Sequence, residues 1–215
     1  MEISVLASLA ISLFFTVLGS LSQTSKRTVI FLALQAASIG FVEFMYCLIN
    51  LVIGLHMEAL IDFLAAFIEW FTCAVVIPLI IYWGIMKTED ISEQPIVGGG
   101  RLIALSVVLT ILCLIVGDLS SSVMPKNLET SPFVVFMFAS SCILMAYRRD
   151  PLKILAGLNM AENAFYPLLA ESPLNLIPFM LALMVFVNIV GVFITIEAYR
   201  EYGTTLISKW RWIEQ

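Results

Sequence analysis

Three glutamates, Glu43, Glu69 and Glu162, each lie near the middle of a long run of apolar residues. A charge at the centre of a bilayer costs about 2.5–3.5 kcal/mol on insertion scales, so acids at this depth are rare unless they are used. No lysine or arginine lies at a matching depth, so these acids are either protonated or paired with a partner subunit. A carboxyl group in a low dielectric holds its proton to higher pH and can then exchange it near neutrality. The three glutamates are therefore candidates for proton transfer.

Other polar residues extend this pattern. Asp118 lies toward the outer side of another apolar run, and Asp62 lies seven residues before Glu69. On a helix this spacing places both carboxyl groups on nearly one face, about two turns apart. Asn159 lies three residues before Glu162, again on one face. The residues predicted for a proton path are Glu43, Glu69, Glu162, Asp118, Asp62 and Asn159.

Hydrogen bonding between helices is the alternative role for polar side chains at this depth. It accounts best for a set of amides and one hydroxyl, namely Gln35, Ser38, Asn163 and Asn188. It accounts less well for the glutamates, because an amide makes the same bonds without the cost of burying an acid. We therefore expect these amides to join helices and the acids to carry the function.

The sequence contains no group of residues spaced to bind a metal ion or a redox centre. The four cysteines stand alone, without the paired spacing of zinc or iron–sulfur sites, at Cys47, Cys73, Cys113 and Cys142. The single histidine, His56, falls in a predicted loop. We expect no catalytic residue, no metal and no cofactor, and interpret the cysteines as small apolar side chains.

The elements that carry the acids are predicted to be membrane helices. Apolar residues make up 61% of the 215 positions, charged residues make up 13%, and the mean hydropathy is +1.02. Soluble domains do not have this composition. The alternating segments of an outer-membrane barrel are absent, so helices remain as the way to satisfy the backbone in lipid. The expected fold class is all-α integral membrane, and the net charge of −5 argues against a nucleic-acid partner.

Seven apolar runs are predicted to cross the bilayer, which requires roughly 20 residues per helix. Their bounds are 3–22, 28–54, 60–86, 102–123, 131–147, 152–171 and 174–200. With the N-terminus outside, ten of the eleven basic residues fall on the cytoplasmic side, and Lys126 is the exception. This sorting agrees with the positive-inside rule. It predicts a multi-pass protein of the inner (cytoplasmic) cell membrane, with the N-terminus outside and the C-terminus in the cytoplasm.

We expect a single membrane domain over residues 1–215. The first span opens with Glu2 and lacks the basic start of a signal peptide, so we expect it to remain in the mature chain. The domain divides into N-terminal helices (1–86), a connecting helix (102–123), C-terminal helices (131–200) and a cytoplasmic tail (201–215).

A motif in the C-terminal half points to a family. Residues 157–165 read GLNMAENAF, follow the basic pair Arg148-Arg149, and precede a span that ends in EAYR at Arg200. Over residues 148–200 this pattern resembles the E component of hydrogenase-4 type complexes. The last three helices of that component are similar to the K subunit of respiratory complex I and to the C subunit of multisubunit cation/proton antiporters. Length and helical character agree over the whole chain.

The resemblance implies a non-catalytic membrane-arm subunit of a group 4 energy-converting hydrogenase, a formate hydrogenlyase or a related complex, with acids on a lateral proton path. Its partners would be antiporter-like and other membrane-arm subunits and a hydrogenase or related redox module. Glu162 falls within the matching motif. The chain departs from the complex I subunit at two glutamates, which are replaced by Asn159 and by Val187 or Asn188.

Two further interpretations stay open. The chain is alternatively a structural scaffold that bridges antiporter-like subunits, or a component of a multisubunit cation/proton antiporter. A stand-alone transporter is less favoured, because the sequence lacks charged clusters of substrate size. A parallel repeat, with helices one to three matching helices five to seven, is an additional hypothesis in which Glu43 and Glu162 are loose counterparts.

Overall fold

The computed structural model describes residues 2–93, 131–166 and 177–210, together with positions 101, 104, 105, 108, 111, 112 and 115. Helices make up the regular structure of these residues, and no strand occurs among them. The all-helical prediction is therefore confirmed for the described part. The elements are α1 (Glu2–Leu21), α2 (Ser25–Ile53), α3 (His56–Phe71), η1 (Thr72–Val76), α4 (Ile77–Lys87), α6 (Ser131–Tyr147), α7 (Pro151–Asn163), α9 (Ile177–Tyr202) and η3 (Ile207–Lys209).

The ends of α2 and the start of α7 carry residues that commonly begin or end helices. The Thr24 side chain accepts a hydrogen bond from the backbone N–H of Arg27 and so caps the start of α2. At the other end of α2, Gly54 has a φ of 89°, a left-handed conformation that favours glycine. Asp150 caps α7, whose first residue is Pro151, where a missing N–H costs nothing.

A π-helical turn interrupts the predicted helix at 60–86. Helices α3 and α4 flank η1, in which the N–H of Ile77 bonds to the carbonyl of Thr72, five residues back. Pro78 follows directly and brings no N–H, so the α-helical ladder cannot run through this point unchanged. Short π-helical turns of this kind occur frequently at functional sites.

One predicted boundary differs clearly from the structure. The span expected at 152–171 is described as α7, which ends at Asn163 and is followed by a turn at Ala164 and Phe165. The backbone N–H of Phe165 bonds to the carbonyl of Glu162, three residues back, which is the tighter 3₁₀ pattern that often ends an α-helix. Glu162 therefore lies in the last turn of α7 and not at the middle of a long helix. The predicted span at 102–123, with Asp118, lies outside the described residues apart from isolated positions.

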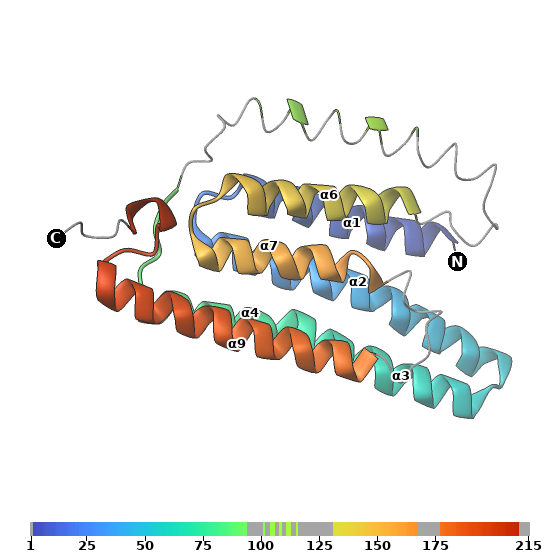
Figure 1. Ribbon diagram of the computed structural model, residues 1–215. Coiled ribbons are helices and arrows are strands. Elements are labelled where there is room, and N and C mark those ends of the chain that lie inside the picture. The colour runs from blue at the N-terminus through green and yellow to red at the C-terminus, as the bar shows by residue number, and fades with distance from the viewer. Residues whose placement is uncertain are drawn as a thin grey trace.

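The helices lie roughly parallel or antiparallel in a layered bundle. Figure 1 shows α1 beside α6, α7 beside α2, and α4 beside α9, with α3 extending α4. Helix α2 is central, since it packs on α1, α3, α4 and α7. Close approach depends on glycine at Gly84, where an added Cβ would lie 2.8 Å from a methyl group of Val192. The core is built mainly from Leu32, Ile77, Met137, Leu152 and Met160.

The outer surface of the bundle is strongly apolar. Large exposed side chains on different helices include Phe14, Phe67, Phe179, Phe186 and Phe193. Two described stretches, Ala59–Lys87 and Pro178–Lys209, are long and apolar enough to cross a membrane, and only 41% and 33% of their most apolar windows are buried inside the protein. Length and composition of two helices give weak support for a membrane location.

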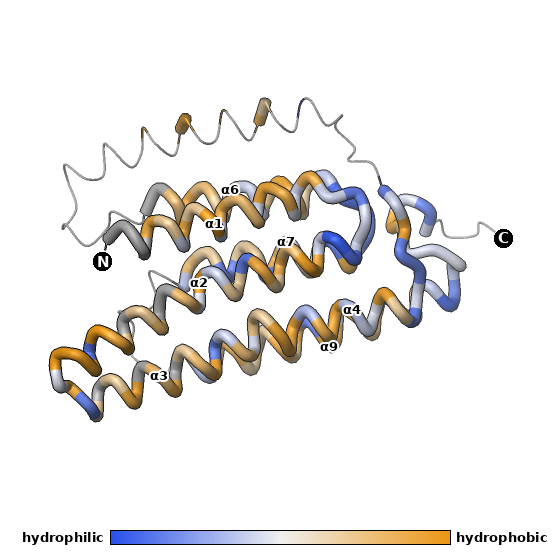
Figure 2. The backbone as a smooth tube through the Cα atoms, turned by 180° about the vertical axis from the view of Figure 1, so that it is seen from behind, coloured by the Kyte–Doolittle hydropathy of each residue, from blue (hydrophilic) through white to orange (hydrophobic). Residues whose placement is uncertain are grey.

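Basic residues gather at one end of the bundle. The α1–α2 and α6–α7 turns and the C-terminal ends of α4 and α9 meet there, as Figure 1 shows, and hydrophilic residues are concentrated at this end in Figure 2. The described basic residues on these segments are Lys26, Arg27, Lys87, Arg148, Arg149, Lys153, Arg200 and Lys209. His56 begins α3 at the opposite end.

Candidate functional site

A chain of polar side chains runs through the apolar core, beginning on α1. The Thr16 hydroxyl donates to the backbone carbonyl of Ser12 at 2.9 Å. The Gln35 amide nitrogen, on α2, donates to Thr16 Oγ1 at 2.9 Å and to the carbonyl of Met160 on α7 at 3.1 Å. Ser12, Thr16 and Gln35 are fully buried. Three helices are thus joined by a polar group that no apolar side chain could replace.

The chain continues to Asn163 at the end of α7. Its amide nitrogen donates to Gln35 Oε1 at 3.4 Å, while its Oδ1 atom has no hydrogen-bond partner among the residues that the structure describes. Asn163 is only 1% exposed. A buried acceptor without a donor is rare in folded proteins and requires an explanation.

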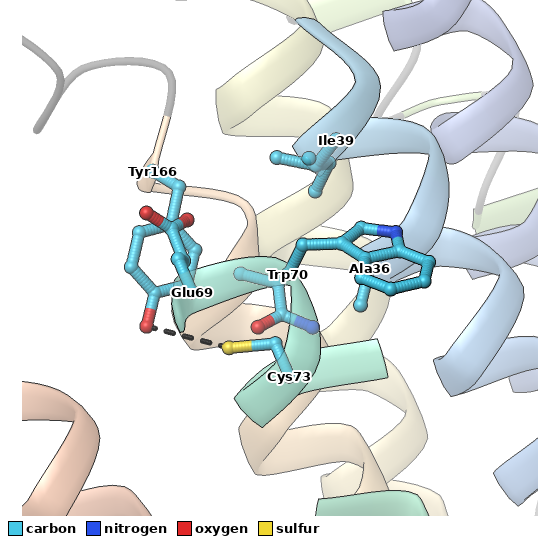
Figure 3. Close-up of a pocket in the computed structure, with 8 residues that line it drawn as sticks. Ala36, Ile39, Glu69, Trp70, Cys73 and Tyr166 are labelled. Carbon is cyan, nitrogen blue, oxygen red and sulfur yellow. Dashed lines mark hydrogen bonds between the residues drawn. The ribbon is translucent and has the colours of Figure 1, made fainter. Parts of the chain in front are cut away.

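Asn163 also lines a small pocket. It is lined by Ala36, Ile39, Gly40, Glu69, Trp70, Cys73, Asn163 and Tyr166. Glu69 is 3% exposed, so its carboxyl group is inside the bundle. Figure 3 shows the Glu69 and Tyr166 side chains on one side of the pocket, and Ala36 and Ile39 of α2 on the other. The pocket therefore combines one buried acid with neutral polar groups and an apolar wall.

Tyr166 connects the pocket to α9. Its hydroxyl accepts a hydrogen bond from the Cys73 thiol, with 3.6 Å between Sγ and the oxygen, and donates to the Met184 sulfur at 3.1 Å. Glu69 lines the same pocket as Tyr166. Cys73 belongs to the π-helical turn, which places its thiol toward Tyr166.

A pair of amides joins α7 to α9 one turn away. Asn159 and Asn188 exchange two hydrogen bonds of 2.8 Å, and their nitrogens also donate to the carbonyls of Leu155 and Met184. Each amide nitrogen and each amide oxygen has a partner. The pair has the geometry of an interhelical joint, the role that we expected for Asn188.

The predicted site residues thus fall into different places. Glu69 lies in the pocket, Glu162 lies half-buried at the end of α7, and Asn159 lies in the amide pair. Glu43 is on α2 and Asp62 on α3, but their side chains lie outside the described part of the protein, as does all of Asp118.

Tyr166 and Thr16 were missed as site residues. Tyr166 follows Glu162 by four positions, the spacing of neighbours on one helix face, but it precedes Pro167 and resembled an aromatic residue of a helix interior. Thr16 and Ser12 are also four apart on α1, and this spacing was the signal that could have identified them. Cys73, which we interpreted as a small apolar side chain, lines the pocket together with Glu69.

A second group of buried polar side chains lies at the basic end of the bundle. Lys153 is fully buried, and its ammonium lies 3.7 Å from the Glu93 carboxylate. Arg148 donates to the carbonyls of Ser20 at 2.8 Å, Ser22 at 2.6 Å and Glu93 at 3.0 Å. These contacts tie the segment after α4 to both neighbouring turns.

Asp150 completes this ionic group. Its carboxylate accepts from the backbone N–H of Leu152 at 3.1 Å and from the Ser25 hydroxyl. Burial raises the pKa of Asp150, and the hydrogen bonds from Ser25 and Leu152 oppose that rise. Burial lowers the pKa of Arg148, which the Glu93 carboxylate opposes. Acidic and basic side chains are both present in this ionic group. We therefore interpret it as a structural contact that holds neighbouring segments together.

No cluster of three or more histidine, cysteine or acidic side chains able to hold a metal ion occurs among the described residues. Comparison of the chain with models of known protein families, with characterised proteins and with solved structures gives no match.

Proposed function

We propose that this chain is a multi-pass membrane subunit that provides part of a proton path within a larger complex. The observation that carries this proposal is the oriented chain of hydrogen bonds from Thr16 through Gln35 to Asn163, which ends at the pocket of buried Glu69. Proton transfer requires a group that can hold a proton and neighbours that can bond to it in both states. The pocket holds a buried carboxyl group beside neutral polar side chains, which supports this role.

The distribution of polarity supports a membrane setting. Amides, hydroxyls and an acid are buried, while phenylalanines such as Phe179 and Phe186 face outward. In water, such an apolar outer surface would be unfavourable. In a bilayer, the apolar surface contacts lipid, and the polar groups form hydrogen bonds with one another inside the bundle. Basic residues at one end of the bundle support a cytoplasmic position for that end, with the N-terminus outside.

The proposed complex is of the hydrogenase-4 type: a group 4 energy-converting hydrogenase or formate hydrogenlyase, with antiporter-like and other membrane-arm subunits as partners. This part rests on the resemblance of residues 148–200. The redox module would carry out the chemistry, and this chain would contribute Glu69 and Glu162. A multisubunit cation/proton antiporter is the related alternative setting.

A structural scaffold is the second candidate function, and the amide pair of Asn159 and Asn188 favours it. This pair binds α7 to α9 without any group that exchanges protons readily. The ionic group around Lys153 likewise has the character of a joint. A scaffold would need these contacts and would have no use for the carboxyl group of Glu69.

Replacement of Glu69 by glutamine in the intact complex distinguishes the two functions. Glutamine keeps the size and hydrogen bonding of the side chain but cannot release a proton. We expect the Glu69→Gln complex to assemble normally and to lose at least tenfold in proton movement per turnover, measured with a pH-sensitive dye in membrane vesicles. Glu197→Gln, at an exposed position on α9, is the matched control and should leave proton movement unchanged. Full coupling in Glu69→Gln would leave the scaffold function standing.

A further inference from the structure

The chain turns aside after α9 instead of continuing along the helix axis. Gly203 ends the helix with a φ of 68°, the left-handed conformation that favours glycine. The chain then folds back, because the Trp210 ring stacks on the Tyr202 ring with 5.9 Å between the ring centres. The indole N–H of Trp210 also donates to the Thr204 carbonyl at 3.0 Å. We call residues 204–210 the C-terminal hook.

A backbone hydrogen bond holds the C-terminal hook against the turn between α6 and α7. The N–H of Ile207 donates to the Arg149 carbonyl at 3.0 Å, and the N–H of Arg149 donates to the Glu93 carboxylate at 2.7 Å. Arg149 makes these structural contacts through its backbone. Arg149 and Lys209 are both exposed, and their side chains have no ion-pair partner among the residues that the structure describes. Two cationic groups are therefore available beside this bond.

The position of the hook along α9 matches the headgroup layer of a bilayer. Exposed apolar side chains on α9 extend as far as Phe193 and Ile194. The first charged residue of the helix is Glu197, and Tyr202 lies five residues further, about 7.5 Å along the axis. A hydrocarbon core of about 30 Å in a bilayer of about 40–45 Å leaves about 5–8 Å for each headgroup layer. In the proposed membrane setting, the stacked pair of Tyr202 and Trp210 therefore lies at headgroup depth.

Helix α4 reaches the same end with the same order of side chains. Tyr82 and Trp83 are exposed on its surface, and the exposed Lys87 lies one helical turn after Trp83. Figure 1 shows α4 and α9 ending side by side. Tyrosine and tryptophan are enriched where a membrane meets water, since each has an apolar ring and a polar atom. Two helices thus mark one boundary.

Exposed basic side chains outnumber exposed acids on the described segments at this end. Glu197 pairs with Arg200 at 2.6 Å, and Asp90 lies 4.0 Å from Lys26. The exposed residues outside these pairs are two acids and four bases, namely Glu89, Glu201, Arg27, Lys87, Arg149 and Lys209. Groups of Lys and Arg at the cytoplasmic boundary of a membrane attract anionic lipid headgroups. The charge of this surface therefore complements that of an anionic leaflet.

We propose that the C-terminal hook and Arg149 form a binding surface for anionic phospholipid headgroups of the cytoplasmic leaflet. The cationic groups of Arg149 and Lys209 bind the phosphate, while Ile207, which is 44% exposed, contacts the upper part of the acyl chains. The headgroup depth of the Tyr202–Trp210 pair favours lipid over a cytoplasmic protein as the occupant. This inference rests on the membrane setting of the proposed function and does not depend on the proton path.

Quenching of tryptophan fluorescence by brominated phospholipids tests this surface in the full-length chain. The protein is placed in phosphatidylcholine nanodiscs, in which brominated phosphatidylglycerol or brominated phosphatidylcholine replaces an increasing share of the lipid. The difference in emission between each protein and its Trp210→Phe counterpart isolates Trp210 from the other tryptophans. We expect half-quenching of Trp210 at a share of brominated phosphatidylglycerol about fivefold lower than that of brominated phosphatidylcholine.

The Arg149→Gln/Lys209→Gln double variant should lose this preference for phosphatidylglycerol. Both substitutions change exposed side chains and keep the backbone bond from Ile207 to Arg149, so the hook should remain folded. Arg27→Gln removes one exposed positive charge from the start of α2 and is the matched control, which should change the preference by less than twofold. The Arg149→Lys/Lys209→Arg variant keeps both charges and should bind like the wild type.

Three outcomes would overturn the inference. Trp210 that neither lipid quenches lies outside the bilayer, which would favour a cytoplasmic protein as the occupant. Equal quenching by the two lipids would exclude a preference for anionic headgroups. A preference that Arg27→Gln lowers as much as the double variant would reflect the overall charge and not the hook.

The fate of the proposed function is decided separately. It would survive each of these outcomes if proton movement in the complex still depended on Glu69. Conversely, the lipid preference could behave as expected while Glu69→Gln leaves proton movement intact. The hook would then bind anionic lipid, and the proton path would fail.

Discussion

Individual buried polar residues in this protein are stabilised in two different ways. In the middle of the bundle, neutral groups such as Gln35 bond to one another and need no counter-charge. At the basic end, full charges are buried together, with Lys153 against Glu93. Charges remain expensive to bury unless they are paired, so the ionic group should tolerate the loss of one partner poorly.

Replacement of Lys153 by methionine should therefore be strongly destabilising. The change keeps the apolar stem but leaves the Glu93 carboxylate buried beside fewer positive charges, at a cost of about 3–5 kcal/mol. Denaturant unfolding of the purified protein in detergent measures the difference. Lys26→Met is the control: its ammonium lies 4.0 Å from Asp90 at a partly exposed site, so the loss should be about 0–1 kcal/mol. Equal effects of the two changes would show that Glu93 does not depend on Lys153.

Among the elements, the π-helical turn determines where Glu69 points. A turn closed by a bond from Ile77 to Thr72 holds one more residue than an α-helical turn. Each residue added to or removed from a helix rotates the remainder of that helix by about 100°. The turn therefore sets the rotation of α3, which carries Glu69, relative to α4, whose Ile81 and Ile85 are in the core.

Deletion of a single residue tests this role. Removing Val75 from η1 should convert the turn to α-helix, keep both flanking faces in place and cost no more than about 1–2 kcal/mol. Removing the exposed Leu79 from α4 should instead rotate Ile81 and Ile85 out of the core, at roughly 1.5–3 kcal/mol for each side chain. Thermal unfolding followed by circular dichroism compares the two. If the Val75 deletion is the more harmful, the π-helical turn is not a one-residue insertion.

For the molecule as a whole, one end of the bundle is basic and the other is not. The turns that bear Arg148 and Lys26 lie together at one end, although 122 positions separate these two residues in the sequence. His56 lies at the other end, between α2 and α3. This polarity is the basis of the proposed orientation in the membrane.

Cysteine labelling in whole cells tests that orientation. In a variant without the four native cysteines, His56→Cys should react with a membrane-impermeant thiol reagent added from outside. Glu201→Cys, which is exposed at the end of α9, should react only after the cells are opened. The reverse pattern would place the basic end outside. Equal labelling of both positions in intact cells would contradict a membrane-spanning arrangement altogether.

The sequence by itself was sufficient for the positions of most helices and for the burial of Glu69. Apolar runs bounded by polar turns mark helices, and the predicted run at 131–147 coincides with α6. Hydrophobicity is a property of each residue, so its pattern can be read along the chain. The early end of α7 was not predicted, because the proline after Tyr166 was interpreted as lying within a membrane helix.

Only the tertiary structure decided which polar groups meet. Gln35 bonds to Thr16 on one side and to Asn163 on the other, and Lys153 pairs with Glu93 from a segment that carried no signal. A hydrogen bond requires its two atoms to lie within about 3 Å, so it depends on the rotation and depth of each helix. Nearly uniform apolar faces do not encode that rotation. Packing at close contacts such as Gly84 against Val192, and the π-helical turn before Pro78, set it instead.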